Sequence, residues 1–312
     1  MRIGVIGLGD IAQKAYLPIM TQLNNVELVF CTRDASVLAA LSEKYRIKHC
    51  YSDYRELTKQ HVDAVMIHAA TSVHFDVAFW FLTQGIPTFV DKPLVDSGEQ
   101  VELLYNLAEK YQTPLYVGFN RRHIPLYNKH LPELASGNVG ELLSLRWEKN
   151  RHNLPGDIHT FIFDDFIHAL DSVNLNCKST LEDVYLTHQM SGNQLSRVDV
   201  QWQAGQCLLH ASMNRLTGIT NETVSATYYN QSYQFPAFTR GQRWLNNEER
   251  ILTSEDWTPM LATKGFEAMI KDWLYVVEEG SMPMHTIERN ISSHQLADAI
   301  SHQLRSIFKT DA

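Results

Sequence analysis

A glycine turn stands directly behind the first apolar run of this 312-residue chain. Residues 2–6, Arg-Ile-Gly-Val-Ile, are typical of a short buried strand, and residues 7–12, Gly-Leu-Gly-Asp-Ile-Ala, follow at once. Apolar residues at helical spacing come next, from Ile11 to Ile19. A strand, a glycine turn and a helix N-terminus in this order form a cradle for a pyrophosphate, because the free N–H groups of the helix face the anion.

Each small residue of the turn has its own reason. Gly7 permits the tight turn, Gly9 lets the backbone approach the phosphates, and Ala12 lets the helix pack on the strand. A turn of this composition in another fold is the structural alternative, but its place between a strand and a helix favours dinucleotide binding. The predicted contacts from the turn are Gly7, Gly9, Asp10, Ile11 and Ala12.

Strand-like and helix-like runs alternate through the first 120 residues. Apolar strands separated by helices of about 10 to 15 residues imply right-handed crossovers and a parallel sheet buried on both faces. We therefore expect a doubly wound α/β Rossmann domain over residues 1–120, with its ligand at the carboxyl ends of the strands. The predicted strands are residues 2–6, 26–31, 63–68, 86–90 and 114–118, and the predicted helices are residues 35–45, 72–84 and 98–111.

The pattern changes after Arg122. Successive β-type runs joined by short turns indicate a largely antiparallel sheet. We expect residues 121–312 to form an α+β domain with an open sheet that carries helices on one face. The predicted strands are residues 141–151, 182–189, 196–203, 207–214 and 222–229. The predicted helices are residues 158–176, 266–278 and 290–308, and loops at 153–157 and 235–244 are expected to shape the pocket.

Charge and composition exclude several classes of partner. The net charge of -8 argues against nucleic acid and anionic membranes, which bind basic surfaces. No apolar stretch reaches the length of a membrane span. The four cysteines and the scattered histidines show no zinc-type spacing, so we expect no metal, and reduced thiols in a cytoplasmic protein.

The residues behind the second predicted strand bear on the choice of cofactor. Enzymes that prefer NAD usually place an acidic residue about 20 residues after the glycine turn, to hold the ribose. Here the Thr32 hydroxyl and the Arg33 guanidinium suit a 2′-phosphate, although Asp34 can still accept from the ribose. The sequence therefore favours NADP and leaves NAD possible, with Arg33 as an ordinary solvated residue as the alternative.

Two further segments carry polar side chains in positions typical of a catalytic site. Lys92 follows the strand predicted at residues 86–90, and the proline after it restrains it to an extended conformation at the strand's carboxyl end. Asp164, His168 and Asp171 share one stripe of the helix predicted at residues 158–176. Such a stripe is unusual for a solvated helix face. A His–Asp pair in a buried network is the structural alternative.

Three motifs together resemble the Gfo/Idh/MocA oxidoreductase family: the glycine turn, the acidic-Lys-Pro triplet at residues 91–93, and Gly-Phe-Asn-Arg-Arg at residues 118–122. Asp91 stands where the family usually has Glu, and residues 69–74 lack its Thr-Pro pair. Within the family the resemblance is strongest to the MviM or YceM oxidoreductases, described as virulence factors. It covers the whole chain. The further cofactor contacts assigned on this resemblance are Thr71, His74, Asp91, Lys92, Asn120 and Arg121.

The resemblance also implies a function. Asp164 and His168 fall on the family's Asp-x-x-x-His pattern, and the sheet of the second domain is expected to pair with another subunit. The expected reaction passes hydride between nicotinamide and a secondary alcohol of a small, sugar-like substrate. His168 would take or return the hydroxyl proton, Lys92 would stabilise charge on the same oxygen, and Asp164 would fix the substrate or the proton relay. Asp171 would orient or cap structure.

Two other functions fit the same residues. A cofactor-binding sensor or interaction protein would need no turnover, and some members of the family use nicotinamide without net redox change to cleave glycosidic bonds. Basic and amide residues also gather near the predicted cleft mouth, which suggests an anionic or strongly polar substrate such as a sugar acid or sugar phosphate. Ordinary solubility at the sheet ends is the alternative. These residues are Arg121, Arg122, His123, Lys149, Asn150, Arg151, His152 and Asn153.

Overall fold

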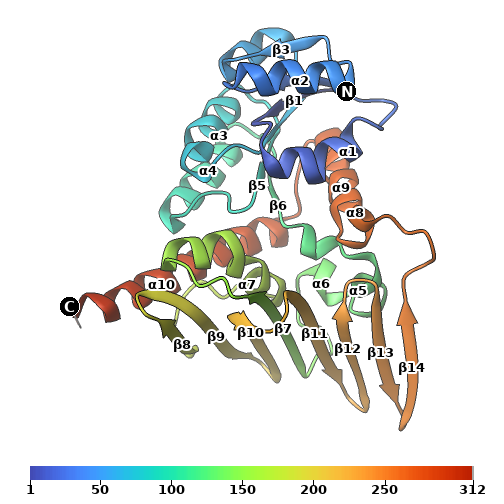
Figure 1. Ribbon diagram of the computed structural model, residues 1–312, viewed down its shortest axis with the longest axis vertical. Helices are drawn as coiled ribbons and strands as arrows, with labels where there is room; N and C mark the ends of the chain where they lie inside the picture. Colours follow the sequence, from blue (N-terminus) through green and yellow to red (C-terminus); the bar gives the residue numbers. More distant parts are fainter. Residues whose placement is uncertain (311–312) are drawn as a thin grey trace. The chain divides into compact units, whose positions relative to one another are not determined.

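The computed structural model describes the backbone of residues 1–310 and the side chains of residues 1–307. The chain divides into two compact units (Figure 1). The first unit consists of Met1–Phe119 and Phe266–Ile287. The second unit consists of Asn120–Gly265 and the segment that begins at Glu288. Each unit has its own sheet.

The first unit contains the predicted doubly wound sheet. Six parallel strands stand in the order β3-β2-β1-β4-β5-β6, so the chain reverses its direction of winding between β1 and β4. Ligands of such folds bind outside the carboxyl ends of the strands at this reversal. The strands are β1 (Arg2–Ile6), β2 (Glu27–Cys31), β3 (His49–Tyr51), β4 (Ala64–Ile67), β5 (Thr88–Asp91) and β6 (Leu115–Gly118).

Helices cover both faces of this sheet, with α3 and α4 on one side and α1 and α9 on the other (Figure 1). Helix α9 comes from far along the chain. It belongs to this unit because the buried Trp273 ring packs 5.9 Å from Phe89 and 5.6 Å from Tyr116. The helices are η1 (Ala12–Tyr16), α1 (Leu17–Met20), α2 (Ala35–Tyr45), η2 (Tyr54–Gln60), η3 (Thr71–Val73), α3 (His74–Thr83), α4 (Gly98–Lys110) and α9 (Phe266–Glu279).

The second unit is built on an eight-stranded sheet in the order β14-β13-β12-β11-β7-β10-β9-β8. Only β7 and β10 pair in parallel, so the largely antiparallel sheet is confirmed. The strands are β7 (Ser144–His152), β8 (Tyr185–Ser191), β9 (Gln194–Ala204), β10 (Cys207–Thr217), β11 (Asn221–Tyr228), β12 (Gln231–Ala237), β13 (Arg240–Leu245) and β14 (Glu248–Thr253).

The prediction of a loop at residues 235–244 is wrong. Most of it belongs to β12 and β13, which pair from Gln231 with Leu245 to Ala237 with Arg240. These strands are rich in Gln and Arg and contain Pro236, as strands near a sheet edge often do. Their polarity hides the period-two pattern on which the prediction depended.

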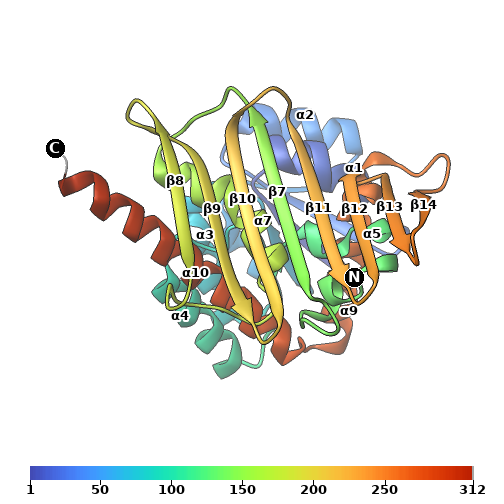
Figure 2. The same ribbon diagram turned by 90° about the horizontal axis from the view of Figure 1, so that it is seen from below.

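Helices lie on one face of the second sheet only. Figure 2 looks onto the opposite face, with α5, α7 and α10 on the far side. Along β7, Trp147 and Lys149 are buried beneath the helices, and Arg146 and Glu148 point to the open face. The helices are η4 (Asn120–His123), α5 (Pro125–His130), α6 (Glu133–Ser136), η5 (Thr160–Phe166), α7 (Ile167–Val173), α8 (Met260–Thr263) and α10 (Met284–Thr310).

Some features are absent from the part of the chain that the structure describes. None of its helices could span a bilayer. None of its groups of His, Cys, Asp and Glu has the arrangement of a metal site. The cysteines Cys31, Cys50, Cys177 and Cys207 are all free.

Candidate active site

The glycine turn after β1 has the geometry that its sequence requires. Gly7 has φ +84°, and a Cβ there would lie 2.5 Å from the backbone nitrogen of Ala69. Its N–H donates to the Cys31 carbonyl oxygen at 2.9 Å, which closes the turn against β2. A Cβ on Gly9, in contrast, would meet nothing within 4 Å. The fold therefore requires glycine at position 7, whereas a side chain at position 9 would extend into open space. Ala12 is fully buried behind the turn, and Asp10 and Ile11 are exposed.

The three polar residues that follow β2 differ in their contacts and exposure. Asp34 begins α2: its Oδ1 accepts from the Ser36 N–H at 3.0 Å, the Ser36 hydroxyl at 2.6 Å and the Val37 N–H at 3.1 Å. The Ser36 hydroxyl is the main cause of a lowered pKa of the Asp34 carboxyl. Arg33 is exposed, and no carboxylate within residues 1–307 forms an ion pair with it. Thr32 is half-buried beside it.

Lys92 follows β5, and its backbone N–H is bound by the side chain of Asp91. The Oδ1 of Asp91 accepts from the Lys92 N–H at 2.8 Å and from the Tyr16 hydroxyl at 3.0 Å. Burial raises the pKa of the Asp91 carboxyl, although Lys92 opposes this shift. The Lys92–Pro93 peptide is cis. The carboxyl of Asp91 and the backbone N–H of Lys92 are thus positioned by contacts within the first unit.

His74 ties this loop to the one after β4. Its Nδ1 lies 3.0 Å from the Pro93 carbonyl oxygen, and its Nε2 lies 2.9 Å from that of Ala69. The imidazole is buried, and it connects the backbone that follows β5 with the backbone that follows β4. Thr71, three residues earlier, is half-buried in η3.

The predicted polar stripe on the helix of the second unit divides into three environments. Residues 160–166 form a π-helical turn before α7, which changes the spacing of the side chains. Asp164 is exposed, His168 is 7% exposed, and Asp171 is fully buried. The carboxylate of Asp171 accepts two hydrogen bonds from the Arg122 guanidinium. Asp171 has the structural role expected of it.

Next to Asp164, the carboxylate of Asp165 is the centre of a buried charge network. Arg151 donates to it twice, at 2.9 and 2.8 Å. The Lys149 amine lies 2.9 Å from its Oδ1, and Arg215 donates to its Oδ2 at 3.1 Å. Burial alone would raise the pKa of the Asp165 carboxyl, but Arg151 and Lys149 together lower it.

Glu222 on β11 extends this network. It accepts from Arg121 at 2.5 and 3.3 Å and from the Trp147 indole at 3.1 Å, and the Lys149 amine lies 3.4 Å away. Burial opposes ionisation, but Arg121 and Lys149 lower the pKa of Glu222 to about 2. We call Arg121, Lys149, Arg151, Asp165, Arg215 and Glu222 the Lys149 cluster.

The basic segment predicted from the sequence is only partly in this cluster. Arg121, Lys149 and Arg151 belong to it. Arg122 binds Asp171 instead, and the ring of His152 faces the Thr217 carbonyl oxygen near the surface. Asp165, Arg215 and Glu222 were not predicted. Trp147, Lys149 and Arg151 alternate along β7, which indicates that they share one face of the strand. Nothing in the sequence indicates the π-helical turn that buries Asp165.

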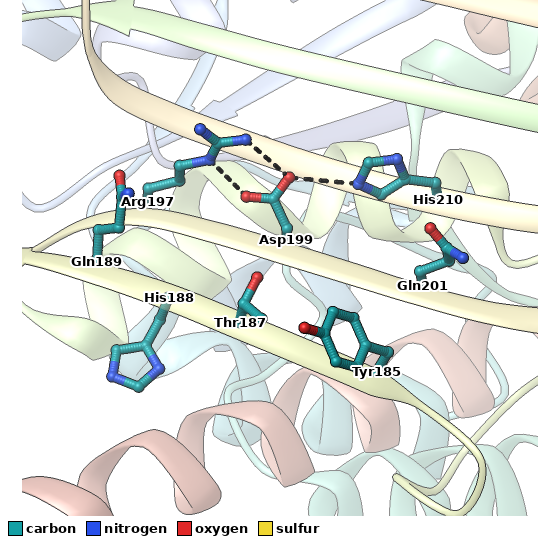
Figure 3. A pocket seen from close by; sticks show the side chains of 8 residues that line it. All are labelled: Tyr185, Thr187, His188, Gln189, Arg197, Asp199, Gln201 and His210. Carbon is teal, nitrogen blue, oxygen red and sulfur yellow. Dashed lines mark hydrogen bonds and ion pairs between the residues drawn. The ribbon is translucent and has the colours of Figure 1, made fainter.

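The open face of the second sheet has its own polar group. A hollow of about 300 Å³ lies over β8, β9 and β10 (Figure 3). Within it, Asp199 accepts from Arg197 at 2.5 and 3.1 Å and lies 3.3 Å from the His210 ring. The lining residues are Tyr185, Thr187, His188, Gln189, Arg197, Asp199, Gln201 and His210.

Comparison with known proteins identifies the family. The family model described as "Oxidoreductase family, NAD-binding Rossmann fold", that of Gfo/Idh/MocA, matches residues 1–119. YceM of Salmonella typhimurium is 30% identical over 312 residues, which cover 96% of this chain and 97% of YceM. The chain belongs to the Gfo/Idh/MocA oxidoreductase family. It is therefore an enzyme with an NAD-binding Rossmann domain, and the expected likeness to YceM is confirmed.

Two further similar proteins extend the comparison. The crystal structure of a family oxidoreductase from Vibrio cholerae is 58% identical, has a TM-score of 0.97 and is matched over 99% of both chains. Inositol 2-dehydrogenase of Corynebacterium glutamicum is 25% identical over 309 residues, which cover 90% of this chain and 87% of that enzyme. These similarities extend over both units of the chain.

Proposed function

We propose that this oxidoreductase is an NADP-dependent dehydrogenase or reductase that interconverts a secondary alcohol and a carbonyl on a small, sugar-like substrate. One observation carries the proposal: the first unit combines a glycine turn bordered by open space with Lys92, whose backbone N–H is bound by Asp91 at the carboxyl end of β5. In this proposal residues 1–120 bind the dinucleotide, and residues 121–312 bind the substrate and a second subunit.

The residues present fit a bound dinucleotide. Gly9 leaves room for a pyrophosphate at the N-terminal end of the helix that follows. The engagement of Asp34 as the cap of α2 supports NADP over NAD, because it leaves Thr32 and Arg33 as the polar groups for the ribose 2′-position. The proposed contacts are Gly7, Gly9, Asp10, Ile11, Ala12, Thr32, Arg33, Thr71, His74, Asp91, Lys92, Asn120 and Arg121.

The proposed chemistry assigns one task to each catalytic side chain. Bound NADP would supply the hydride acceptor, and NADPH the donor. His168 takes the proton from the substrate hydroxyl, or returns it to the carbonyl oxygen in the reverse direction. Lys92 donates a hydrogen bond to the same oxygen and stabilises its developing negative charge. Asp164, which is exposed on the helical turn before His168, orients the substrate hydroxyl groups.

A coupled screen tests the proposal. NADPH and NADH binding are measured by calorimetry, and sugars, sugar acids and inositols are then tested for a change in nicotinamide absorbance. We expect NADPH to bind more tightly than NADH and at least one class of compound to change the redox state of the cofactor. Tight binding without any redox change across the screen would favour the sensor without turnover. Turnover without net change of the cofactor would favour glycosidic bond cleavage.

We also propose that a second copy of the chain packs on the open face of the second sheet. That face carries exposed apolar side chains, among them Leu208 and Leu216 on β10, between polar groups such as Arg146 and Glu148. Exposed apolar residues with a polar surround are typical of an interface between proteins. Sedimentation of wild type and Leu208→Asp tests this. A dimer that dissociates in the variant is expected, and a monomeric wild type would refute the proposal.

A further inference from the structure

The Lys149 cluster contains more positive than negative charge. Four cations surround the two carboxylates of Asp165 and Glu222, although the protein as a whole has a net charge of -8. Burial is the main cause that lowers the pKa of Lys149 to about 8, and the Glu222 and Asp165 carboxylates beside it oppose this shift. Buried ions are normally paired, because an unpaired ion loses its hydration without compensation. Within the cluster the cations therefore outnumber the carboxylates, and the charge of the exposed Asp164 also acts on Arg215.

Some donor atoms of the cluster have no acceptor among the described residues. Arg151 uses its Nε and Nη2 on Asp165, which leaves its Nη1. The Nε of Arg215 is buried without a hydrogen-bond partner, and the Arg215 side chain is only 5% exposed. Lys149 has three N–H groups and two carboxylate contacts. A carboxylate or a phosphate accepts from several N–H groups at once, so either group could satisfy these donors.

Exposure shows where an anion can enter. The side chain of Arg151 is 33% exposed, and those of Arg121, Arg215 and Lys149 are 14%, 5% and 1% exposed. Arg151 therefore stands at the surface of the cluster, and Lys149 at its base. Asp165 directly follows Asp164, the exposed residue to which we assign substrate orientation. One member of the cluster, Asp165, is thus next along the chain to a proposed catalytic residue.

A second buried network in the same unit shows what a purely structural arrangement looks like. Arg289 is also in excess over its carboxylate partner, Asp171. Its guanidinium, however, donates to the carbonyl oxygens of Leu134, Asp171 and Ser172, and it is 2% exposed. Those carbonyl dipoles satisfy the guanidinium and no solvent path is needed. The Lys149 cluster differs because Arg151 is 33% exposed and the buried Nε of Arg215 has no hydrogen-bond partner. The Nη1 of Arg215 does donate to the Leu154 carbonyl oxygen at 3.4 Å, and its guanidinium lies 4.6 Å from the centre of the Phe161 ring.

We propose that the Lys149 cluster binds an anionic group, a carboxylate or a phosphate, on the substrate of the enzyme. The proposal rests on the function proposed above and names its substrate class: sugar acids or sugar phosphates rather than neutral polyols. The anion enters past Arg151 and is bound by the remaining donors of Arg151, Arg215 and Lys149. Asp165 and Glu222 hold those cations in place.

The test is calorimetric titration of the full-length protein with D-glucuronate, D-glucose 6-phosphate and neutral D-glucose, each with and without saturating NADPH. The first two compounds distinguish a carboxylate from a phosphate, and glucose reports binding without charge. We expect at least one of the anions to bind about 10- to 100-fold more tightly than glucose, as hydrogen bonds to charged groups predict. Arg151→Ala should remove this preference, and Arg151→Lys should restore part of it.

Arg197→Ala is the matched control. Arg197 also donates twice to one aspartate, Asp199, and is 37% exposed, but it lies on the open face of the sheet. The control should keep the full preference for anions. Thermal melting should show that Arg151→Ala is folded, because Asp165 retains Lys149 and Arg215.

Three results would overturn the proposal: equal affinity for glucose and both anions, no anion binding at millimolar concentration, or an unchanged preference in Arg151→Ala. Failure of the function proposed above looks different. A protein that binds the anions without NADPH, but shows no cofactor binding or turnover, would refute the dehydrogenase and leave the anion site in place. Turnover of neutral polyols alone would support the dehydrogenase and refute the anion site.

Discussion

The Arg122 guanidinium binds the Asp171 carboxylate through two hydrogen bonds, from Nε to Oδ2 at 2.9 Å and from Nη2 to Oδ1 at 2.5 Å. The Ser293 hydroxyl on α10 donates to the same carboxylate at 2.8 Å. Asp171 therefore joins η4, α7 and α10 at one buried point. Arg122 and Arg289 overcome the effect of burial and lower the pKa of the Asp171 carboxyl.

Asp171→Asn should strongly destabilise the protein, because it leaves a buried guanidinium without its counter-charge. We expect a loss of about 3 to 5 kcal/mol in the free energy of unfolding, the usual effect of breaking a buried pair. Urea unfolding at neutral pH measures it. Asp199→Asn, in the more exposed pair with Arg197, is the control and should lose about 1 kcal/mol or less. Equal losses in both variants would contradict this interpretation.

The same pair predicts a pH dependence. Because the folded-state pKa of Asp171 is lowered, the stabilisation is complete above the unfolded pKa of about 4 and is lost as the pH falls through the folded value. Wild-type stability should therefore decline in acid more steeply than that of Asp171→Asn. Unfolding curves measured between neutral and acid pH test this, and parallel declines would be evidence against it.

The glycine turn allows a paired prediction in which one substitution disturbs the fold and the other the ligand. Gly7→Ala would place a methyl group 2.5 Å from the Ala69 nitrogen at a positive φ, so we expect a lower melting temperature and no cofactor binding. Gly9→Ala meets no protein atom within 4 Å and should melt like the wild type, but bind NADPH at least about 10-fold more weakly. Unchanged NADPH affinity in Gly9→Ala would remove the pyrophosphate from this turn.

These glycines illustrate which parts of the fold could be predicted. The sheet of the first unit follows from continuous apolar strands separated by helices, because a parallel sheet is buried on both faces. The short edge strand β3 could not be predicted, since none of its residues is fully buried. In the second unit β12, β13 and β14 were missed because many of their exposed side chains are polar or charged, such as Gln234, Arg240 and Glu248.

The candidate site shows a different limit. Lys92 and the glycine turn were predictable because each follows a strand directly, and strand ends determine where such residues lie. The centre of the Lys149 cluster was not. A regular helix of 3.6 residues per turn places Asp164 on one stripe with His168 and Asp171, whereas the π-helical turn at residues 160–166 buries Asp165. The partners of Asp165 come from β7 and β10, which no local pattern brings together.

Arg33→Ala tests the choice of cofactor. If Arg33 binds a 2′-phosphate, the Kd for NADPH should rise about 10- to 100-fold and the Kd for NADH should stay the same. Asp34→Ala is a useful companion, because it removes the cap of α2 and should lower the melting temperature without changing the ratio of the two affinities. A changed ratio in Asp34→Ala would indicate that this carboxylate contacts the ribose.

Lys92→Met tests the proposed electrostatic role of the amine. Turnover should fall about 100- to 1,000-fold, the range found when a donor to a developing oxyanion is removed, while the Kd for NADPH stays within about threefold. Lys110→Met, at an exposed position of α4, should change neither quantity. Full activity in Lys92→Met would exclude this residue from the reaction.

The lowered pKa of Lys149 predicts that binding of an anion is coupled to proton uptake. At pH 8 the amine is only partly protonated, and an anion beside it raises its pKa, so up to about half a proton should enter with each anion bound. Titration with D-glucuronate in two buffers of different ionisation enthalpy measures this number. It should approach zero near pH 6, where the amine is already charged. Lys149→Met, in which Asp165 and Glu222 keep their arginine partners, should bind the anion more weakly and take up no proton. Tight anion binding without proton uptake in the wild type at pH 8 would place the anion away from Lys149.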